Sequence, residues 1–217
     1  MDETIRNIAV YALPVLFAIT LHEAAHAYVA RFFGDNTAYA AGRMTLNPLV
    51  HIDLFGTIII PTVLYLTTGF VFGYAKPVPI DFGRLRNPKR DMAWVALAGP
   101  GANFIMALGW LILGILLVAL NVDEAFPHKV AQAGIIANLL MFAFNLLPIP
   151  PLDGGRVLTS VLPNRLAYKY ARIEPYGFYI VLALLFFNLL SFWVMPVMQL
   201  GRILIQLFAS PFSLLLT

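Results

Sequence analysis

The sequence predicts an all-α polytopic membrane protein, with about five or six apolar helical segments and a short β-hairpin or edge-strand region between the first two full-length helices. Of its 217 residues, 60% are hydrophobic and only 12% are charged, which is too little polar surface to coat a water-soluble globule. The apolar residues also gather in stretches of about 20, the length that a helix needs to cross roughly 30 Å of hydrocarbon.

The first predicted spanning helix covers residues 8–30, which are apolar or small apart from His22, Glu23 and His26. The following residues 34–51 are polar and contain glycine and an Asn-Pro pair, so this segment is predicted to be a loop or a small hairpin.

Two less regular segments follow. Residues 54–72 are apolar but contain two glycines and a proline, and we expect a re-entrant or hairpin segment here instead of a single crossing. Residues 73–91 are basic, and Pro77 and Pro79 exclude the segment from the centre of a sheet because proline cannot donate to a ladder. We therefore predict an exposed edge strand or loop.

The second half of the chain is predicted to contain three more apolar helices, at residues 92–120, 130–147 and 176–194. A last apolar stretch, residues 196–217, either crosses the membrane or lies at its surface. Asn103 is a polar residue in the otherwise apolar first of these helices.

The strongest chemical signal is the run His22-Glu23-Ala24-Ala25-His26 in the first helix. Residues four apart lie on the same helical face, so both imidazoles can reach one metal ion, with Glu23 beside them. In the H-E-x-x-H arrangement zinc activates a water molecule and the glutamate takes its proton. Ionisable residues inside a span are costly and usually functional, although a hydrogen-bonded trio that joins helices is the alternative.

A catalytic zinc site needs a third protein ligand, and the chain has no cysteine, so that ligand must be a histidine or a carboxylate. Four residues remain as candidates at a suitable depth: His51, Asp53, His128 and Asp153. Asp153 is favoured because three nearby prolines break the helix before it and Gly154-Gly155 allows close approach of the backbone. An N-cap role for Asp153 in the following helix is the structural alternative.

Three motifs in order resemble the site-2 protease family of membrane-embedded zinc proteases, in its compact branch without PDZ or CBS domains. They are His22-Glu23-x-x-His26, Gly99-Pro100-x-x-Asn103 and Asn145-x-x-Pro148-x-x-x-Leu152-Asp153-Gly154. The resemblance covers most of the chain. It implies one membrane-embedded protease domain over residues 1–217, with a catalytic core at about 5–165 and C-terminal helices at 176–217.

The resemblance also implies roles for individual residues. Glu23 would be the catalytic base, and Asn145 would polarise the scissile carbonyl or position substrate. One Zn²⁺ would be held by His22, His26 and Asp153. An extended edge segment would clamp the substrate by strand addition, and the substrate-binding residues are Asn103, Tyr74, Ala75, Lys76, Pro77 and Val78.

The implied activity is hydrolysis of a peptide bond in a transmembrane or membrane-anchored protein, within or near the bilayer. A metal-binding membrane transporter that uses the same His/Asp cluster is the alternative, because such residues also line ion pathways. A net charge of +3 does not suggest a nucleic-acid partner.

A shared depth for His22, His26 and Asp153 would place three polar segments, residues 31–53, 73–91 and 149–175, on one side of the membrane. These segments contain most of the lysines and arginines, whereas Arg6 and Lys129 lie on the other side. By the positive-inside rule, we predict that the site opens toward the cytoplasm and that the N-terminus lies outside.

Overall fold

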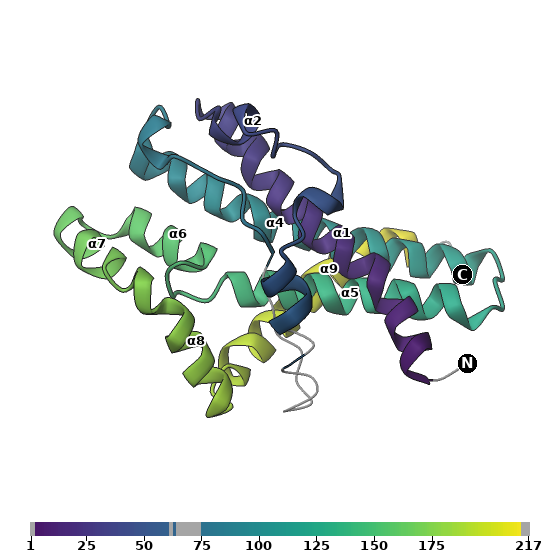
Figure 1. The fold of residues 1–217 in the computed structure, drawn as a ribbon. Helices are drawn as coiled ribbons and strands as arrows, with labels where there is room; N and C mark the ends of the chain where they lie inside the picture. Colours follow the sequence, from purple (N-terminus) through teal and green to yellow (C-terminus); the bar gives the residue numbers. More distant parts are fainter. Residues whose placement is uncertain (1–2, 61–62, 64–74, 214–217) are drawn as a thin grey trace.

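The computed structural model describes residues 3–60, 63 and 75–213, and every regular element in these residues is helical (Figure 1). The prediction of an all-α protein is therefore confirmed. The predicted β-hairpin or edge strand is not supported, because no strand occurs in these ranges. Residues 34–51 form helical turns at α2 (Thr37–Ala40) and η1 (Pro48–Val50) instead.

The segment that we predicted to be an edge strand is unpaired where it is described. Residues 75–80 have no regular structure, and two of the six are prolines without an amide hydrogen. A π-helical turn, η2 (Leu54–Ile59), opens the predicted re-entrant stretch, whose later part lies outside the described residues together with Tyr74.

Three long helices form the centre of the molecule. These are α1 (Glu3–Phe32), α4 (Pro88–Ala119) and α5 (Ala125–Asn145), and each packs against the other two. Small side chains make the close packing possible: a Cβ atom at Gly134 of α5 would collide with the ring of Trp110 on α4. This packing brings the middle of α1 against α4 and α5, where its polar residues must find partners.

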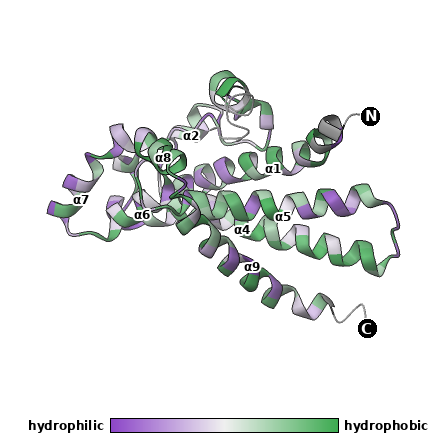
Figure 2. Cartoon of the chain, turned by 90° about the horizontal axis from the view of Figure 1, so that it is seen from below, coloured by the Kyte–Doolittle hydropathy of each residue, from purple (hydrophilic) through white to green (hydrophobic). Residues whose placement is uncertain are grey.

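Shorter helices follow after α5. They are α6 (Asp153–Val161), α7 (Asn164–Ala171), η4 (Glu174–Tyr176) and α8 (Gly177–Phe186), and η3 (Phe82–Arg84) precedes α4. Of these, α6 packs against α4 and so brings the start of α6 to the centre of the bundle. Figure 2 shows hydrophobic residues along α4 and α5 and more hydrophilic residues on α7.

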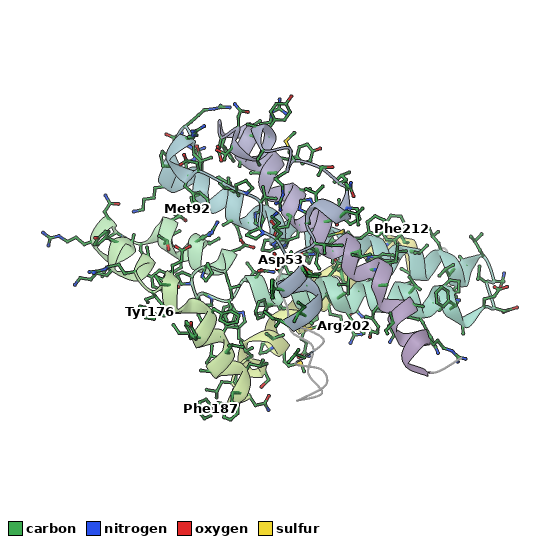
Figure 3. The ribbon with its side chains drawn as sticks, viewed as in Figure 1. Asp53, Met92, Tyr176, Phe187, Arg202 and Phe212 are labelled. Carbon is green, nitrogen blue, oxygen red and sulfur yellow. The ribbon has the colours of Figure 1, made fainter. Side chains whose placement is uncertain are left out.

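The predicted helix at residues 176–194 is instead divided in two. Asn188 has a φ of 57°, a left-handed conformation that ends α8, and α9 (Ser191–Ser213) then begins in a new direction. Tyr176 and Phe187 mark the two ends of α8 in Figure 3. The last apolar stretch is thus longer than predicted, and α9 packs against both α4 and α5.

Three of the described helices are long and apolar enough to cross a membrane: Ile8–Phe32, Pro88–Ala119 and Ser191–Phe212. The predicted span 130–147 is not among them: α5 begins at Ala125, includes the polar His128 and Lys129, and ends at Asn145, before the last two leucines of the predicted span. The expectation of about five or six apolar helical segments is therefore not supported, and the chain is an integral membrane protein with three candidate spans among its described helices.

Both termini lie at the same end of the bundle as the turn between α4 and α5 (Figures 1 and 2). Arg6 and Lys129 line one cavity at that end. The end of α1, the start of α4 and α6 lie toward the opposite end.

Candidate metal centre

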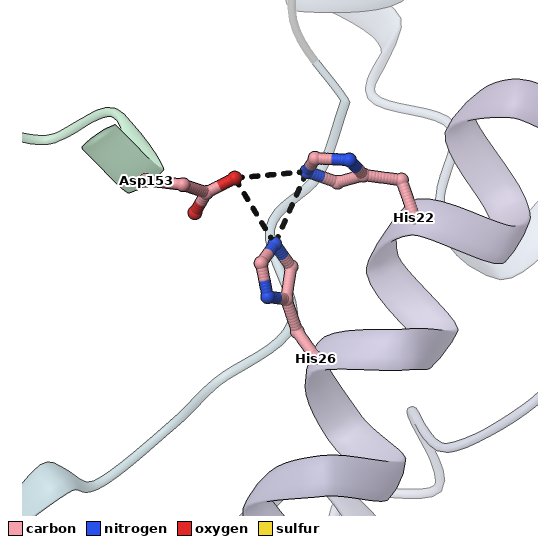
Figure 4. Close-up of side chains that lie close together, drawn as sticks. All are labelled: His22, His26 and Asp153. Atoms are coloured by element: carbon pink, nitrogen blue, oxygen red, sulfur yellow. Dashed lines mark hydrogen bonds and ion pairs between the residues drawn. The ribbon is translucent and has the colours of Figure 1, made fainter. Parts of the chain in front are cut away.

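The H-E-x-x-H residues lie on α1 as the sequence predicts, and both histidines are buried. Figure 4 shows the two imidazoles projecting from the same side of the helix toward Asp153. The Nε2 atoms of His22 and His26 are 3.1 Å apart. The helical spacing therefore delivers two ring nitrogens to one point.

Asp153 is the first residue of α6, and Leu152 is the N-cap, so the alternative role of Asp153 as N-cap is not the one observed. Its Oδ2 atom lies 3.3 Å from His22 Nε2 and 3.4 Å from His26 Nε2. Oδ2 is buried and accepts no hydrogen bond in the described protein. A buried carboxylate oxygen without a hydrogen bond is costly, and it indicates a missing cation.

The three ligand atoms are spaced as a tetrahedral zinc site requires. Bonds of about 2.0–2.1 Å at tetrahedral angles place neighbouring ligand atoms roughly 3.3–3.4 Å apart, and the observed edges are 3.1, 3.3 and 3.4 Å. Three protein ligands also leave one position open, as in catalytic zinc sites. The group His22, His26 and Asp153 can therefore hold a metal ion.

Each histidine is held from behind through its other ring nitrogen. His26 Nδ1 lies 2.7 Å from the carbonyl oxygen of Val95, and His22 Nδ1 lies 2.6 Å from Oδ1 of Asn103. Both acceptors belong to α4. Such outer hydrogen bonds orient a metal-binding imidazole and raise its basicity.

Gly99 lets α4 pass directly behind the histidines. A Cβ atom at this position would lie 2.6 Å from Cε1 of both His22 and His26 and would also collide with His26 Nε2. The glycine of the predicted Gly99-Pro100 pair is thus explained by the space that the two imidazoles occupy.

Glu23 and Asp35 fasten the irregular segment 75–81, which we call the strap, to the end of α1. Glu23 Oε2 accepts a 2.8 Å hydrogen bond from the amide of Val78, and Asp35 Oδ2 accepts one of 2.8 Å from the amide of Asp81. The strap is also tied to the loop before it, because the amide of Lys76 donates to the carbonyl of His51. The proposed base thus lies between the histidines and the strap.

Asp35 was not singled out by the sequence, since it falls in a polar loop where aspartate is common. It is buried and accepts hydrogen bonds from the amide and hydroxyl of Thr37 as well as from Asp81. Burial opposes its ionisation, but these hydrogen bonds and the charge of Arg84 outweigh burial and hold the pKa of Asp35 below its usual value.

A cavity of about 140 Å³ opens at the cluster. Its walls include Glu23, Asn145, Pro77 and Val78 beside the three possible metal ligands. Asn145 is therefore at the site, and its Nδ2 donates to the carbonyl of Met141. The space is smaller than the roughly 300–1,000 Å³ of typical ligand pockets, so it fits a reacting group and water, not a peptide segment.

Asn103 was grouped with the substrate-binding residues, and the structure places its side chain away from the cavity. The side chain is fully buried and does not line the cavity, because its carboxamide is turned toward His22 on the far side of the imidazoles. Asn138 of α5, which the sequence did not single out, is also fully buried, and its Oδ1 accepts a hydrogen bond from Asn103 Nδ2.

The remaining candidate ligands lie outside the cluster. His51 Nε2 lies 3.0 Å from the carbonyl oxygen of Thr45, and His128 Nε2 lies 2.8 Å from that of Val122. Asp53 accepts from the amide of Gly56 and caps η2. The preference for Asp153 over these three residues agrees with the geometry.

Comparison with known proteins gives the family. Residues 121–188 match the model of peptidase family M50. The chain is 39% identical over 210 residues to YwhC of Bacillus subtilis, named as a candidate zinc metalloprotease, and the match covers 94% of this chain and 93% of that protein. The chain belongs to peptidase family M50.

Two further relatives extend this family assignment. Rip2 of Mycolicibacterium smegmatis, also named as a candidate zinc metalloprotease, is 32% identical over 82% of this chain and 67% of its own length. The zinc metalloprotease MJ0392 of Methanocaldococcus jannaschii is 28% identical over 92% of this chain and 47% of its own length. No solved structure matches the chain. This M50 member is a zinc metalloprotease, which removes the transporter alternative.

Proposed function

We propose that this protein is an intramembrane zinc endopeptidase that hydrolyses a peptide bond of a transmembrane or membrane-anchored protein within or near the bilayer. The observation that carries the proposal is the buried triangle of His22, His26 and Asp153 beside Glu23, in which Asp153 Oδ2 accepts no hydrogen bond. Family membership supports zinc-dependent peptide hydrolysis, and the candidate spans support a location in the membrane.

The roles of the individual residues follow from their positions. His22, His26 and Asp153 would hold the zinc, which when bound would supply a Lewis acid that lowers the pKa of a bound water to about 7 and polarises the scissile carbonyl. Glu23 takes the proton of the attacking water and later delivers it to the leaving amine. The amide of Val78 holds one carboxylate oxygen of Glu23, so the orientation of the base depends on the strap.

Asn145 lines the same cavity from the end of α5, where its amide can donate a hydrogen bond to the oxygen of the attacked carbonyl. The donated bond to Met141 uses only one of the two amide hydrogens. Asn145 therefore acts as an oxyanion donor in this proposal.

The strap binds the substrate in an extended conformation, through Ala75, Lys76, Pro77 and Val78 together with Tyr74. Pro77 and Pro79 have no amide hydrogen, and the amides of Lys76 and Val78 already donate within the protein. An added strand is thus held mainly through the carbonyl groups of the strap, which accept hydrogen bonds from substrate amides.

The site opens toward the cytoplasm and the N-terminus lies outside. Support comes from the placement of Arg6 and Lys129 at the end opposite to most of the other lysines and arginines. Single cysteines at residues 6 and 43 should react with an impermeant thiol reagent from opposite sides of sealed vesicles. Labelling of both from the same side would contradict this orientation.

The central experiment compares the wild type with Glu23→Gln in detergent, measuring zinc content and cleavage of a transmembrane peptide. The variant should retain one zinc per chain and lose cleavage by at least about 10²-fold, because only the base is removed. Glu124→Gln, which changes an exposed glutamate in the turn before α5, is the matched control. Undiminished cleavage by Glu23→Gln would refute the assignment of the base.

A further inference from the structure

Two buried carboxamides form a chain behind His22. Asn103 Oδ1 lies 2.6 Å from His22 Nδ1, and Asn103 Nδ2 donates to the carbonyl of Ala18 at 3.1 Å and to Asn138 Oδ1 at 3.0 Å. Asn138 Nδ2 in turn donates to the carbonyl of Gly134 at 2.9 Å. Both side chains are 0% exposed, and the chain links α1, α4 and α5.

The direction of every bond in this chain is fixed by two backbone carbonyls. A carbonyl oxygen only accepts, so Gly134 requires the amide nitrogen of Asn138 on its side and leaves Asn138 Oδ1 facing Asn103. Ala18 likewise requires the amide nitrogen of Asn103. Both hydrogens of that nitrogen are then used, and Asn103 must present its oxygen to His22.

An oxygen acceptor at Nδ1 determines the state of the imidazole. A neutral imidazole at His22 must carry its hydrogen on Nδ1, and Nε2, which lies 3.3 Å from Asp153 Oδ2, is then left with a lone pair. This is the tautomer that binds a metal through Nε2. If the Asn103 carboxamide were reversed, the hydrogen would move to Nε2 and block the ligand position.

We propose that Asn138 is a positioning residue for the metal centre: through Asn103 it keeps His22 in the tautomer and orientation that bind zinc. This inference rests on the proposed role of His22 as a ligand. Asn138 touches neither the cavity nor the histidines, and its effect is transmitted entirely by the Asn103 carboxamide. Outer-shell partners of this kind typically change metal affinity 10–100-fold.

The competing explanation is that Asn138 only joins α5 to α4 by a hydrogen bond inside the membrane. Such a bond would affect stability and leave the metal affinity unchanged. Trp193 provides a control for this case, because its Nε1 donates a 3.0 Å hydrogen bond from α9 to the carbonyl of Ala143 on the same helix α5. Trp193→Phe removes that bond without touching the carboxamide chain.

The test uses Asn138→Ser as the disrupting variant and Asn138→Asp as the conservative one. A serine hydroxyl bonds to the carbonyl four residues earlier in a helix, here that of Gly134, so this carbonyl keeps its donor. The hydroxyl is too short to accept from Asn103, whose amide nitrogen then loses its acceptor on α5. A protonated aspartic acid, the form that burial favours, retains both hydrogen bonds.

Two quantities are measured: the zinc dissociation constant by competition with a chelator, and ¹⁵N shifts of labelled histidine in the metal-free protein. The chain has only four histidines, so the His22 signals can be assigned from a His22→Gln sample. Asn138→Ser should weaken zinc binding about 10–100-fold and convert His22 from the Nδ1–H form to a mixture of tautomers. Asn138→Asp and Trp193→Phe should match the wild type in both measurements.

Unchanged zinc affinity and an unchanged His22 tautomer in Asn138→Ser would overturn the inference, whatever happens to its thermal stability. If Asn138→Ser does not fold, Asn138→Ala is measured in its place, and a wild-type zinc affinity together with a wild-type His22 tautomer in that variant would overturn the inference as well. Failure of the proposed function looks different: His22→Gln would then retain stoichiometric, tightly bound zinc.

Discussion

Replacing Gly99 with alanine tests the geometry of the metal centre, because Gly99 is not a metal ligand but lies directly against the two imidazoles. The new Cβ atom would lie 2.6 Å from Cε1 of His22 and from Cε1 of His26, where ordinary contacts begin at 3.4 Å. Unless α4 retreats, both rings must move by about 0.8 Å, several times the roughly 0.2 Å tolerance of a metal–ligand bond. An overpacked core typically costs about 1–3 kcal/mol.

If that cost falls on the metal-bound state, zinc affinity falls roughly 5–150-fold, since about 1.4 kcal/mol corresponds to a factor of ten. The assay is chelator competition on purified protein, with thermal unfolding measured in parallel. Gly101→Ala is the matched control on the same helix, because a Cβ atom there meets nothing within 4 Å. It should leave zinc binding intact and stabilise the helix by about 0.5–1 kcal/mol.

The reasoning would be refuted if Gly99→Ala bound zinc as tightly as the wild type while Gly101→Ala also did so. Equal losses in both variants would equally refute it, because the effect would then come from α4 as a whole. Only a loss confined to Gly99→Ala attributes the requirement for glycine to the two imidazoles.

Three further predictions concern the strap and the turn after α8. Val78→Pro removes the amide that donates to Glu23 and should lower kcat/KM about 10–100-fold, as expected for a hydrogen bond of about 1.5–3 kcal/mol to a charged group. The zinc content should stay constant. Equal activity in Val78→Pro and in the control Val78→Ala would contradict the role of the amide. Because the folded pKa of Asp35 lies below its usual value, its carboxylate stabilises the protein above about pH 4 and the contribution is lost as pH falls through the folded pKa. Asp35→Asn should therefore unfold at a lower temperature than the wild type at pH 7, and the difference in unfolding temperature should shrink toward pH 3. A difference that does not depend on pH would exclude this explanation. So would the same pH dependence in Asp123→Asn, a control variant in an exposed loop. Asn188→Ala should destabilise the protein by about 1–2 kcal/mol, because a φ of 57° is unfavourable for alanine. The measurement is thermal unfolding, with Asn188→Gly as the control. An equal loss of stability in Asn188→Gly would argue against backbone strain as the cause.

The site was predictable where the chemistry is local. The four-residue spacing of His22 and His26 on one helix determines a shared face, and the scarcity of carboxylates at membrane depth favoured Asp153. The roles of Asn103 and Asn138 were not predictable in this way, because they depend on the register of α4 and α5 against α1. A polar residue in each apolar stretch was visible, but only the packed helices show that the two residues meet.

The fold was predictable to a similar degree. The helical class and the long helices α1 and α4 follow from apolar length. The division at Asn188 does not, since asparagine in a left-handed turn carries no hydropathy signal. The expected edge strand also did not form in the described residues, because its prolines and its bonds to Glu23 and His51 leave it unpaired.

The metal cluster draws its members from distant parts of the chain. His22 and His26 lie in α1, whereas Asp153 opens α6, after both α4 and α5. Since a chain is made and folds from its N-terminus, Glu23 and the two imidazoles are synthesised well before the third member of the cluster. A nascent or truncated chain that ends before α6 therefore has only a partial cluster, and the hydrolytic centre is assembled only when α6 docks against α4.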